Sequence, residues 1–302
     1  MDKKVAIACL SLIFAATLQL PSQAETVIER VARTGVLTAG TSTDAIPLAY
    51  DNDKGELVGY SVDMLNLIKA QLEARLGKPI QLDFVEITPE DRISKIEGRE
   101  VDIICEAVSF TWNREQYVDF STSYGVTGTK LLVKKSSSIN SAESLAGKRV
   151  GVISETTNEQ VIKLVQPQAT LVPIKDIAAG FTALEAGKID ALAWDAMLLE
   201  GFRQTVNQPE TFAVVPEAAY DREGLACMVP QNDSTFRNLV DFTLVKFMQG
   251  VVGGDSQSVA IFDRWFGPNG VIPVRREQVD QFFKYVIDSH EQISNAKEQP
   301  QP

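Results

Sequence analysis

The sequence predicts an α/β fold made of two lobes of similar plan. Two series of alternating strand and helix patterns follow one another along the chain, and a polar stretch at 134–144 separates them. Alternation of this kind produces largely parallel sheets with helices on their faces. The length of 302 residues suits two compact units of roughly 100 to 200 residues each. With 44% hydrophobic and 23% charged residues, the composition argues against a disordered, collagen-like or coiled-coil chain.

The first series begins with a short buried strand at 36–39 and a turn at 51–55 that is rich in Asp, Asn and Gly. Apolar residues then recur every three or four positions, which predicts a helix with Ser61 as its N-cap and Gly77 as its stop. The series continues with a strand at 80–84, a short helix at 91–96 and a strand at 101–108.

The second series repeats this plan after the polar stretch. Its predicted strands and helices are a strand at 149–153, a helix at 158–164, a strand at 171–174, a helix at 177–186, a strand at 189–194, a helix at 196–206 and a strand at 212–215. The chain then returns to a strand at 224–229 and to helices at 236–248, 259–266 and 279–287.

The first 24 residues have the features of a secretory signal peptide. Two lysines precede an apolar run at 5–20, and the small residues Ser22 and Ala24 follow it. The run is shorter than the roughly 20 apolar residues that a membrane-spanning helix needs. We therefore expect cleavage after Ala24 and export to the periplasm.

Charge and histidine content exclude several functional classes. The net charge is −11 and no basic run exceeds two residues, so nucleic acid is not an expected partner. The single histidine, His290, lies in a polar segment, which excludes a Ser-His-Asp triad and a His-rich zinc site. We expect no metal and no cofactor. Apart from Cys9 in the apolar run, Cys105 and Cys227 are the only cysteines, and an oxidising compartment would allow them to pair.

Polar side chains follow three of the predicted strands. Ser109 and Arg114 follow the strand at 101–108, Thr156 and Thr157 follow the strand at 149–153, and Asp195 follows the strand at 189–194. In open α/β sheets, ligands bind beyond the carboxyl ends of the strands. These residues are therefore the first candidates for a binding site.

The candidate set suits a zwitterion. Arg114 can grip a carboxylate with two parallel N–H bonds, and Asp195 can accept from an ammonium group, so together they would bind both ends of an α-amino acid. Each residue also has a structural alternative. Arg114 could be solvated, and Asp195, Thr156 and Thr157 could cap the helices that follow them.

Five stretches resemble the periplasmic solute-binding proteins of polar amino-acid ABC transporters (family 3), especially their glutamate/aspartate branch. They are 59–63, 109–121, 147–157, 187–195 and 261–267. The resemblance implies a type II, Venus-flytrap fold with the ligand in the cleft between the lobes. Lobe 1 would comprise 25–126 and 223–290, lobe 2 would comprise 127–222, and 291–302 would be a flexible tail. Crossings near 125–130 and 220–224 would serve as the hinge.

The resemblance also implies roles for single residues. Arg114 would bind the ligand α-carboxylate, helped by Ser109 and by the backbone at Ala107 and Thr157, and Asp195 would bind the α-ammonium. Arg92 stands where acidic-ligand members use an arginine on the ligand side chain. A structural pairing near the hinge is the alternative for Arg92.

Departures from the acidic-ligand pattern affect the expected ligand. Ser42 replaces an arginine, Pro89 replaces a serine and Ile177 replaces a histidine. Glu106 occupies a position that is usually small. If Glu106 faces the cleft it favours an ammonium, guanidinium or amide side chain. A Glu106 that points to solvent or pairs with Arg92 would not discriminate between ligands.

The aromatic residue that often covers the ligand is also absent. Tyr50, Trp112 or Trp194 could replace it, although core packing is an alternative for the tryptophans. The resemblance further places Cys105 and Cys227 on neighbouring strands, where a disulfide is expected.

The expected function is therefore the binding of a free L-amino acid by a monomer, without chemistry, and its delivery to the membrane permease of an ABC transporter. Two alternatives use the same pocket. One is a cyclohexadienyl or arogenate dehydratase with Glu106 or Glu155 as its acid, and the other is a ligand sensor for a receptor.

Overall fold

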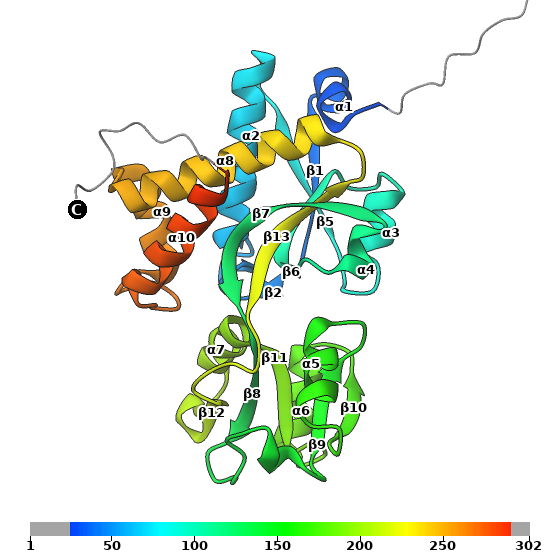
Figure 1. Ribbon diagram of the computed structural model, residues 1–302, viewed down its shortest axis with the longest axis vertical. Coiled ribbons are helices and arrows are strands. Elements are labelled where there is room, and N and C mark those ends of the chain that lie inside the picture. The colour runs from blue at the N-terminus through cyan, green and yellow to red at the C-terminus, as the bar shows by residue number, and fades with distance from the viewer. Residues whose placement is uncertain (1–24, 291–302) are drawn as a thin grey trace, which may run out of the picture.

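The computed structural model describes residues 25–290 and consists of two α/β lobes, one above the other in Figure 1. The expected two-lobed fold is confirmed. The predicted signal peptide, 1–24, and the predicted tail, 291–302, lie outside the described residues. Within 25–290, every helix is too short or too polar to cross a membrane.

The first lobe is built on a five-stranded sheet. Its order is β5 (Gln81–Glu86), β1 (Val36–Thr41), β6 (Ile103–Ser109), β13 (Glu223–Pro230) and β7 (Val118–Thr127). A small second sheet contains β2 (Asp44–Ala45), β3 (Ala49–Asp51) and β4 (Leu57–Val58). The helices of this lobe are α1 (Val27–Thr34), α2 (Tyr60–Leu76), α3 (Arg92–Glu97), α4 (Trp112–Glu115), α8 (Ser234–Gly253), α9 (Ser256–Phe266) and α10 (Arg276–His290).

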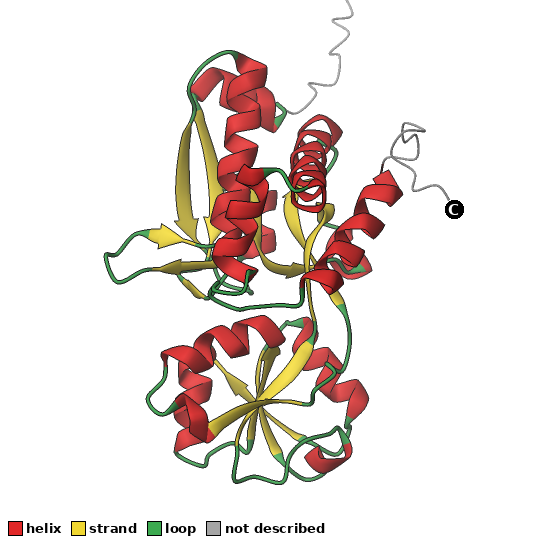
Figure 2. Ribbon diagram, turned by 90° about the vertical axis from the view of Figure 1, so that its left-hand side faces the viewer, coloured by secondary structure: helices red, strands yellow, loops and turns green. Residues whose placement is uncertain are grey.

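The second lobe has a five-stranded sheet of the same kind, flanked by helices as Figure 2 shows. The strand order is β10 (Thr170–Ile174), β9 (Arg149–Ile153), β11 (Ala191–Asp195), β8 (Thr129–Lys134) and β12 (Phe212–Val215). The helices are α5 (Thr157–Val165), α6 (Ile177–Glu185) and α7 (Ala196–Thr205), with short 3₁₀ turns at Glu143–Leu145 and Pro209–Thr211.

The prediction of largely parallel sheets was wrong for half of each sheet. In the first lobe β13 runs antiparallel to β6 and β7, and in the second lobe β8 runs antiparallel to β11 and β12. Parallel neighbours need a long crossover connection, usually a helix. In the first lobe, by contrast, β7 leads toward the second lobe and β13 returns from it, so these two neighbours run in opposite directions.

The start of α2 also differs from the prediction. Its N-cap is Gly59, not Ser61. A Cβ atom at Gly59 would lie 1.9 Å from the carbonyl oxygen of Leu48, and the φ angle of 151° disfavours other residues. Ser61 is buried instead, and its hydroxyl forms a 2.8 Å hydrogen bond with the hydroxyl of Tyr124.

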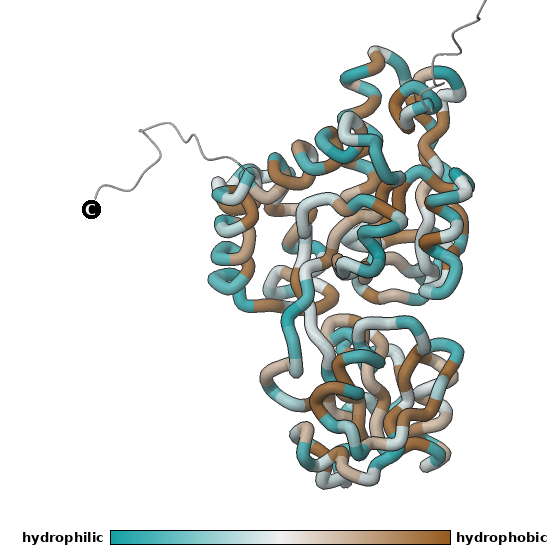
Figure 3. The backbone as a smooth tube through the Cα atoms, turned by 45° about the vertical axis from the view of Figure 1, so that its right-hand side comes forward, coloured by the Kyte–Doolittle hydropathy of each residue, from teal (hydrophilic) through white to brown (hydrophobic). Residues whose placement is uncertain are grey.

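Buried apolar residues fill the interior of both lobes, and in Figure 3 hydrophobic and hydrophilic stretches alternate along the helices. This alternation is typical of helices that bury one face. In the first lobe Cys105 on β6 lies opposite Cys227 on β13, and the two buried residues form a disulfide.

Two adjacent chain segments connect the lobes. The first passes through Gly128, and the second contains Asp221 just before β13. The backbone N–H of Thr129 donates to Asp221 Oδ1 at 2.6 Å. A Cβ atom at Gly128 would lie 2.3 Å from the carbonyl oxygen of Asp221, so only glycine allows this close approach. The boundaries predicted for the two lobes remain a prediction.

Candidate ligand-binding site

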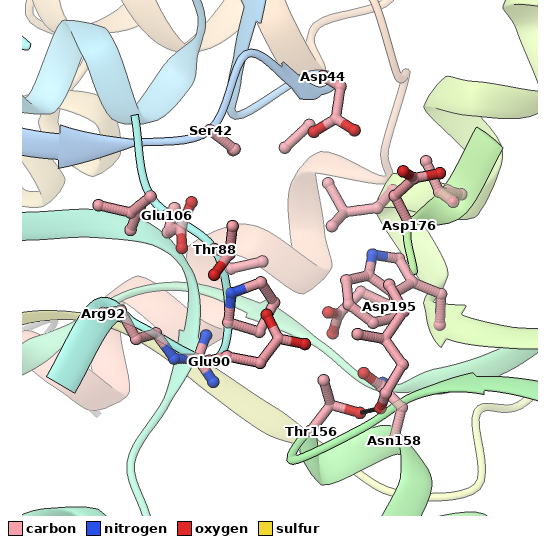
Figure 4. A pocket seen from close by; sticks show the side chains of 18 of the residues that line it. Ser42, Asp44, Thr88, Glu90, Arg92, Glu106, Thr156, Asn158, Asp176 and Asp195 are labelled. Atoms are coloured by element: carbon pink, nitrogen blue, oxygen red, sulfur yellow. Dashed lines mark hydrogen bonds between the residues drawn. The ribbon is translucent and has the colours of Figure 1, made fainter. Parts of the chain in front are cut away.

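A cavity of about 470 Å³ lies between the lobes and is lined by residues of both. Figure 4 shows Ser42, Glu106 and Arg92 on the side of the first lobe and Asp176 and Asp195 on the side of the second. The cavity wall contains eight of the nine predicted binding residues, namely Ser42, Arg92, Glu106, Ala107, Arg114, Thr156, Thr157 and Asp195.

Arg114 is a buried cation that forms no ion pair with another residue in 25–290. It lies on the short helix α4, where Thr111 accepts a hydrogen bond from its backbone N–H. Its guanidinium donates to the carbonyl oxygen of Ser109 at 2.8 Å and to that of Glu155 at 3.4 Å. Burial, followed by the nearby charge of Arg92, lowers the pKa of Arg114 to about 10. The side chain is therefore protonated at neutral pH and suited to an anion.

Asp195 presents a buried acidic group to the same cavity. It ends β11 and is 5% exposed, and its Oδ1 atom has no hydrogen-bond partner among the described residues. Although Asp195 is the N-cap residue of α7, its side chain makes no capping hydrogen bond. Burial, then the carboxylates of Glu223 and Asp221, raises the pKa of Asp195 to about 8. A cationic ligand group would pair with this carboxyl.

The neighbouring hydroxyl groups are already engaged. Thr156 caps α5 by accepting from the N–H of Glu159, and its hydroxyl donates to the carbonyl of Ile153 at 2.7 Å. Ser109 is buried but is not among the described residues that line the cavity. The hydroxyls of Ser109 and Thr157 both donate to Glu223 Oε2.

Glu223 was missed by the sequence analysis. It is half-buried at the start of β13, where the second connection enters the first lobe. The one available signal was its position, two residues after Asp221 within the predicted crossing. Residues two apart in an extended segment project to the same side, so the pair could have been recognised as a hinge feature.

Arg92 and Glu106 lie at another part of the wall, and both are buried. Arg92 Nε has no hydrogen-bond partner among the described residues, and within 25–290 the two side chains form no ion pair at 4 Å or less. Burial lowers the pKa of Arg92 and raises that of Glu106, and the opposite charge of each partner counteracts the shift. The pair thus presents a donor and an acceptor side by side.

The departures from the acidic-ligand pattern all occupy cavity positions. Ser42, Pro89 and Ile177 line the wall, as does Asp176, which projects from the second lobe toward Asp44 of the first. Ser42, Pro89 and Ile177 themselves carry no positive charge. Within 25–290, no group of three or more His, Cys, Asp or Glu side chains is arranged to hold a metal ion.

The three candidate aromatic residues lie in different environments. Trp194 lines the cavity. Trp112 is 78% exposed on α4, and Tyr50 packs edge-on against Trp265 in the first lobe. Of the three, Trp194 is therefore the one placed to contact a ligand.

Comparison with known proteins gives the family. A family model described as bacterial extracellular solute-binding proteins, family 3, matches residues 37–268. The chain is 31% identical over 244 residues to a glutamate/aspartate import solute-binding protein of Salmonella typhimurium, and the match covers 79% of each chain.

Solved structures share the fold. An ancestral arginine-binding protein bound to glutamine is 25% identical, with a TM-score of 0.68 over 77% of this chain and 98% of that chain. An ancestral amino acid-binding protein, described as a precursor of cyclohexadienyl dehydratase, is 23% identical, with a TM-score of 0.67 over 80% of this chain and 99% of that one.

The fold and the interlobe cavity define a two-lobed binding protein. Because the family model covers most of the sequence, the chain belongs to the bacterial extracellular solute-binding proteins, family 3.

Proposed function

We propose that this protein binds a free polar L-amino acid in its interlobe cavity and delivers it to the membrane permease of an ABC importer. The observation that carries the proposal is the presence in one cavity of two buried groups, the Arg114 guanidinium and the Asp195 carboxyl, neither of which forms an ion pair within 25–290. A volume of about 470 Å³ suits a small organic ligand.

The main chain of the ligand would be bound by these two groups. Arg114 would hold the α-carboxylate with two parallel N–H bonds, and the free N–H groups at the start of α5 would add donors. Asp195 Oδ1 would accept from the α-ammonium. Both ligand charges would then be paired inside the closed cleft, where unpaired charge is costly.

We propose a side-chain carboxamide, as in glutamine or asparagine, for the distal group of the ligand. A carboxamide has one acceptor oxygen and one donor nitrogen. The oxygen would accept from Arg92, and the nitrogen would donate to Glu106. A carboxylate would meet the negative charge of Glu106, and a guanidinium or ammonium would meet the positive charge of Arg92.

A thermal-shift screen of the purified protein against all common L-amino acids tests this function. A ligand that binds only the folded form stabilises the protein and so raises its melting temperature. At a ligand concentration of 100 times the Kd, the added stability is about 2.7 kcal/mol. We expect the largest shift with glutamine or asparagine. If no amino acid shifts the transition, the proposed function is wrong, and if arginine or glutamate gives the largest shift, the carboxamide assignment is wrong.

Binding without chemical conversion distinguishes this proposal from a dehydratase. Of the two nominated acids, Glu106 lines the cavity and has a raised pKa, whereas Glu155 is not among the described lining residues. Incubation of the protein with prephenate or arogenate should leave both unchanged. Conversion that disappears in Glu106→Gln would replace the binding proposal with an enzymatic one.

Location and assembly follow from the same proposal. We propose export through the predicted signal peptide, action in the periplasm as a monomer, and recognition of the closed form by the permease. Size-exclusion chromatography with light scattering measures the assembly directly. Binding of the liganded protein to a chemoreceptor, without stimulation of transport, would favour the sensor alternative.

A further inference from the structure

Glu223, at the start of β13, connects the two lobes through hydrogen bonds. Its Oε2 atom accepts a hydrogen bond from the hydroxyl of Ser109, at the end of β6 in the first lobe. The same atom accepts at 2.9 Å from the hydroxyl of Thr157, the first residue of α5 in the second lobe. One side chain on the returning connection therefore holds a donor from each lobe.

Ser109 is the residue expected from the sequence to help bind the ligand α-carboxylate, and Thr157 lines the cavity. A hydroxyl has one proton to donate. While Ser109 and Thr157 donate to Glu223, they offer only lone pairs to any other group. The hydroxyls can donate to a bound ligand carboxylate only if their hydrogen bonds to Glu223 break.

The surroundings of Glu223 make that exchange unfavourable. Burial, followed by the adjacent carboxyl of Asp221, raises the pKa of Glu223 to about 7, while the hydrogen bonds from Ser109 and Thr157 lower it. The charge of Glu223 contributes to the raised pKa of Asp195 and counteracts the lowering of the pKa of Arg114, so Glu223 lies within electrostatic range of both proposed ligand-binding groups. An arriving carboxylate would remove two donors from Glu223 and add a like charge near it.

We infer that Glu223 is an internal competitor for the ligand α-carboxylate, because it occupies the Ser109 and Thr157 hydroxyls in the empty cleft and lowers the affinity for ligand. This inference rests on the proposed function and makes Glu223 a positioning residue that acts through the two hydroxyls. Its loss should therefore strengthen binding, whereas loss of a purely structural hinge contact should weaken it.

The test compares wild type with Glu223→Gln by isothermal titration calorimetry, using the amino acid that gives the largest thermal shift. The amide keeps the size of the side chain but removes the charge, and charged hydrogen bonds are about twice as strong as neutral ones. We expect the Kd to fall about tenfold, which corresponds to about 1.4 kcal/mol. Glu100→Gln, an exposed position with the same change in charge, should bind like wild type.

A second variant separates competition for the hydroxyls from a general effect of charge. In a Thr157→Val background one contested proton is absent, so the gain from Glu223→Gln should shrink to less than threefold. A full tenfold gain in that background would overturn the inference, as would unchanged or weaker binding by Glu223→Gln. If Glu223→Gln does not fold, Glu223→Ala must give the same tighter binding. A wild type that binds no amino acid would instead refute the proposed function.

Discussion

Arg114 and Asp195 line one cavity from opposite lobes, and neither forms an ion pair with another residue in 25–290. Arg114 comes from the helix after β6, and Asp195 ends β11. A buried charge without a partner is expensive. The presence of a guanidinium and an acidic carboxyl, both buried and without an ion-pair partner in 25–290, is the physical basis for proposing a zwitterionic ligand.

Replacement of Arg114 tests the carboxylate assignment. Arg114→Ala would leave the ligand carboxylate unpaired in a closed cleft, which costs roughly 2 to 5 kcal/mol, or about 30-fold to several thousand-fold in Kd. Arg114→Lys keeps the charge but loses the planar fork, so it should fall between wild type and Ala. Calorimetric Kd values measure this series. Arg75→Ala, at an exposed position, is the matched control, and an unchanged Kd in Arg114→Ala would contradict the assignment.

Binding should be linked to proton release at Asp195. Its pKa of about 8 in the empty protein means that the carboxyl is mostly protonated at pH 7. An ammonium group favours the ionised form, so binding below about pH 8 must release a proton, and affinity should rise with pH from 6 to 8. Calorimetry at pH 7 in buffers of different ionisation enthalpy counts the protons. In Asp195→Asn the proton release on ligand binding that is attributed to Asp195 should vanish. The same proton release in this variant would refute the assignment of Asp195 as the releasing group.

Asp195→Asn should also stabilise the empty protein at high pH. The folded-state pKa of Asp195 is raised to about 8 from an ordinary 3.8, so its contribution to stability is fully present below about pH 4 and is lost as the pH rises through 8. Asparagine does not ionise. We therefore expect a higher melting temperature than wild type at pH 8, a smaller difference at pH 5, and loss of ligand binding. A melting temperature below that of wild type at pH 8 would show that neighbouring groups compensate the charge of the ionised Asp195 carboxylate.

Glu106→Gln tests the proposed carboxamide site. Loss of the carboxylate removes a charged acceptor for the amide nitrogen, so glutamine should bind about tenfold more weakly. The same change removes the strongest of the negative charges that act on Arg92, so the affinity for glutamate should rise. The ratio of the two Kd values is the relevant measurement. An unchanged ratio would mean that Glu106 does not contact the ligand side chain.

Gly128→Ala tests the packing of the two connections. The added methyl group would meet the carbonyl of Asp221, so the connections must separate. We expect a lower melting temperature and weaker ligand binding, measured by thermal unfolding and calorimetry. Gly253→Ala, where the space around the Cβ position is open, should be tolerated. Wild-type stability in Gly128→Ala would show that the hinge adapts easily.

Local patterns predicted much of this structure. The strands at 149–153 and 212–215 have the predicted bounds, because short apolar runs between polar turns leave few alternatives. The cavity positions of Arg114 and Asp195 followed from the rule that ligands bind beyond the carboxyl ends of strands. By contrast, β7 and β8 were not predicted, since the polar residues of the first and the glycine between them weaken the strand pattern.

Glu223 could not be assigned from the sequence, because its hydrogen-bond partners lie far away along the chain. Ser109 is 114 residues distant and Thr157 is 66 residues distant. Their meeting depends on how the second connection packs beside the first. The same limit applies to Ser109, whose hydroxyl donates to Glu223.

A crystal structure of the protein with its bound amino acid tests the central claim most directly. We predict the α-carboxylate against the guanidinium of Arg114 and the α-ammonium within hydrogen-bonding distance of Asp195 Oδ1, with the lobes closed around the ligand. A ligand bound in the reverse orientation, or outside the cavity between the lobes, would contradict the account.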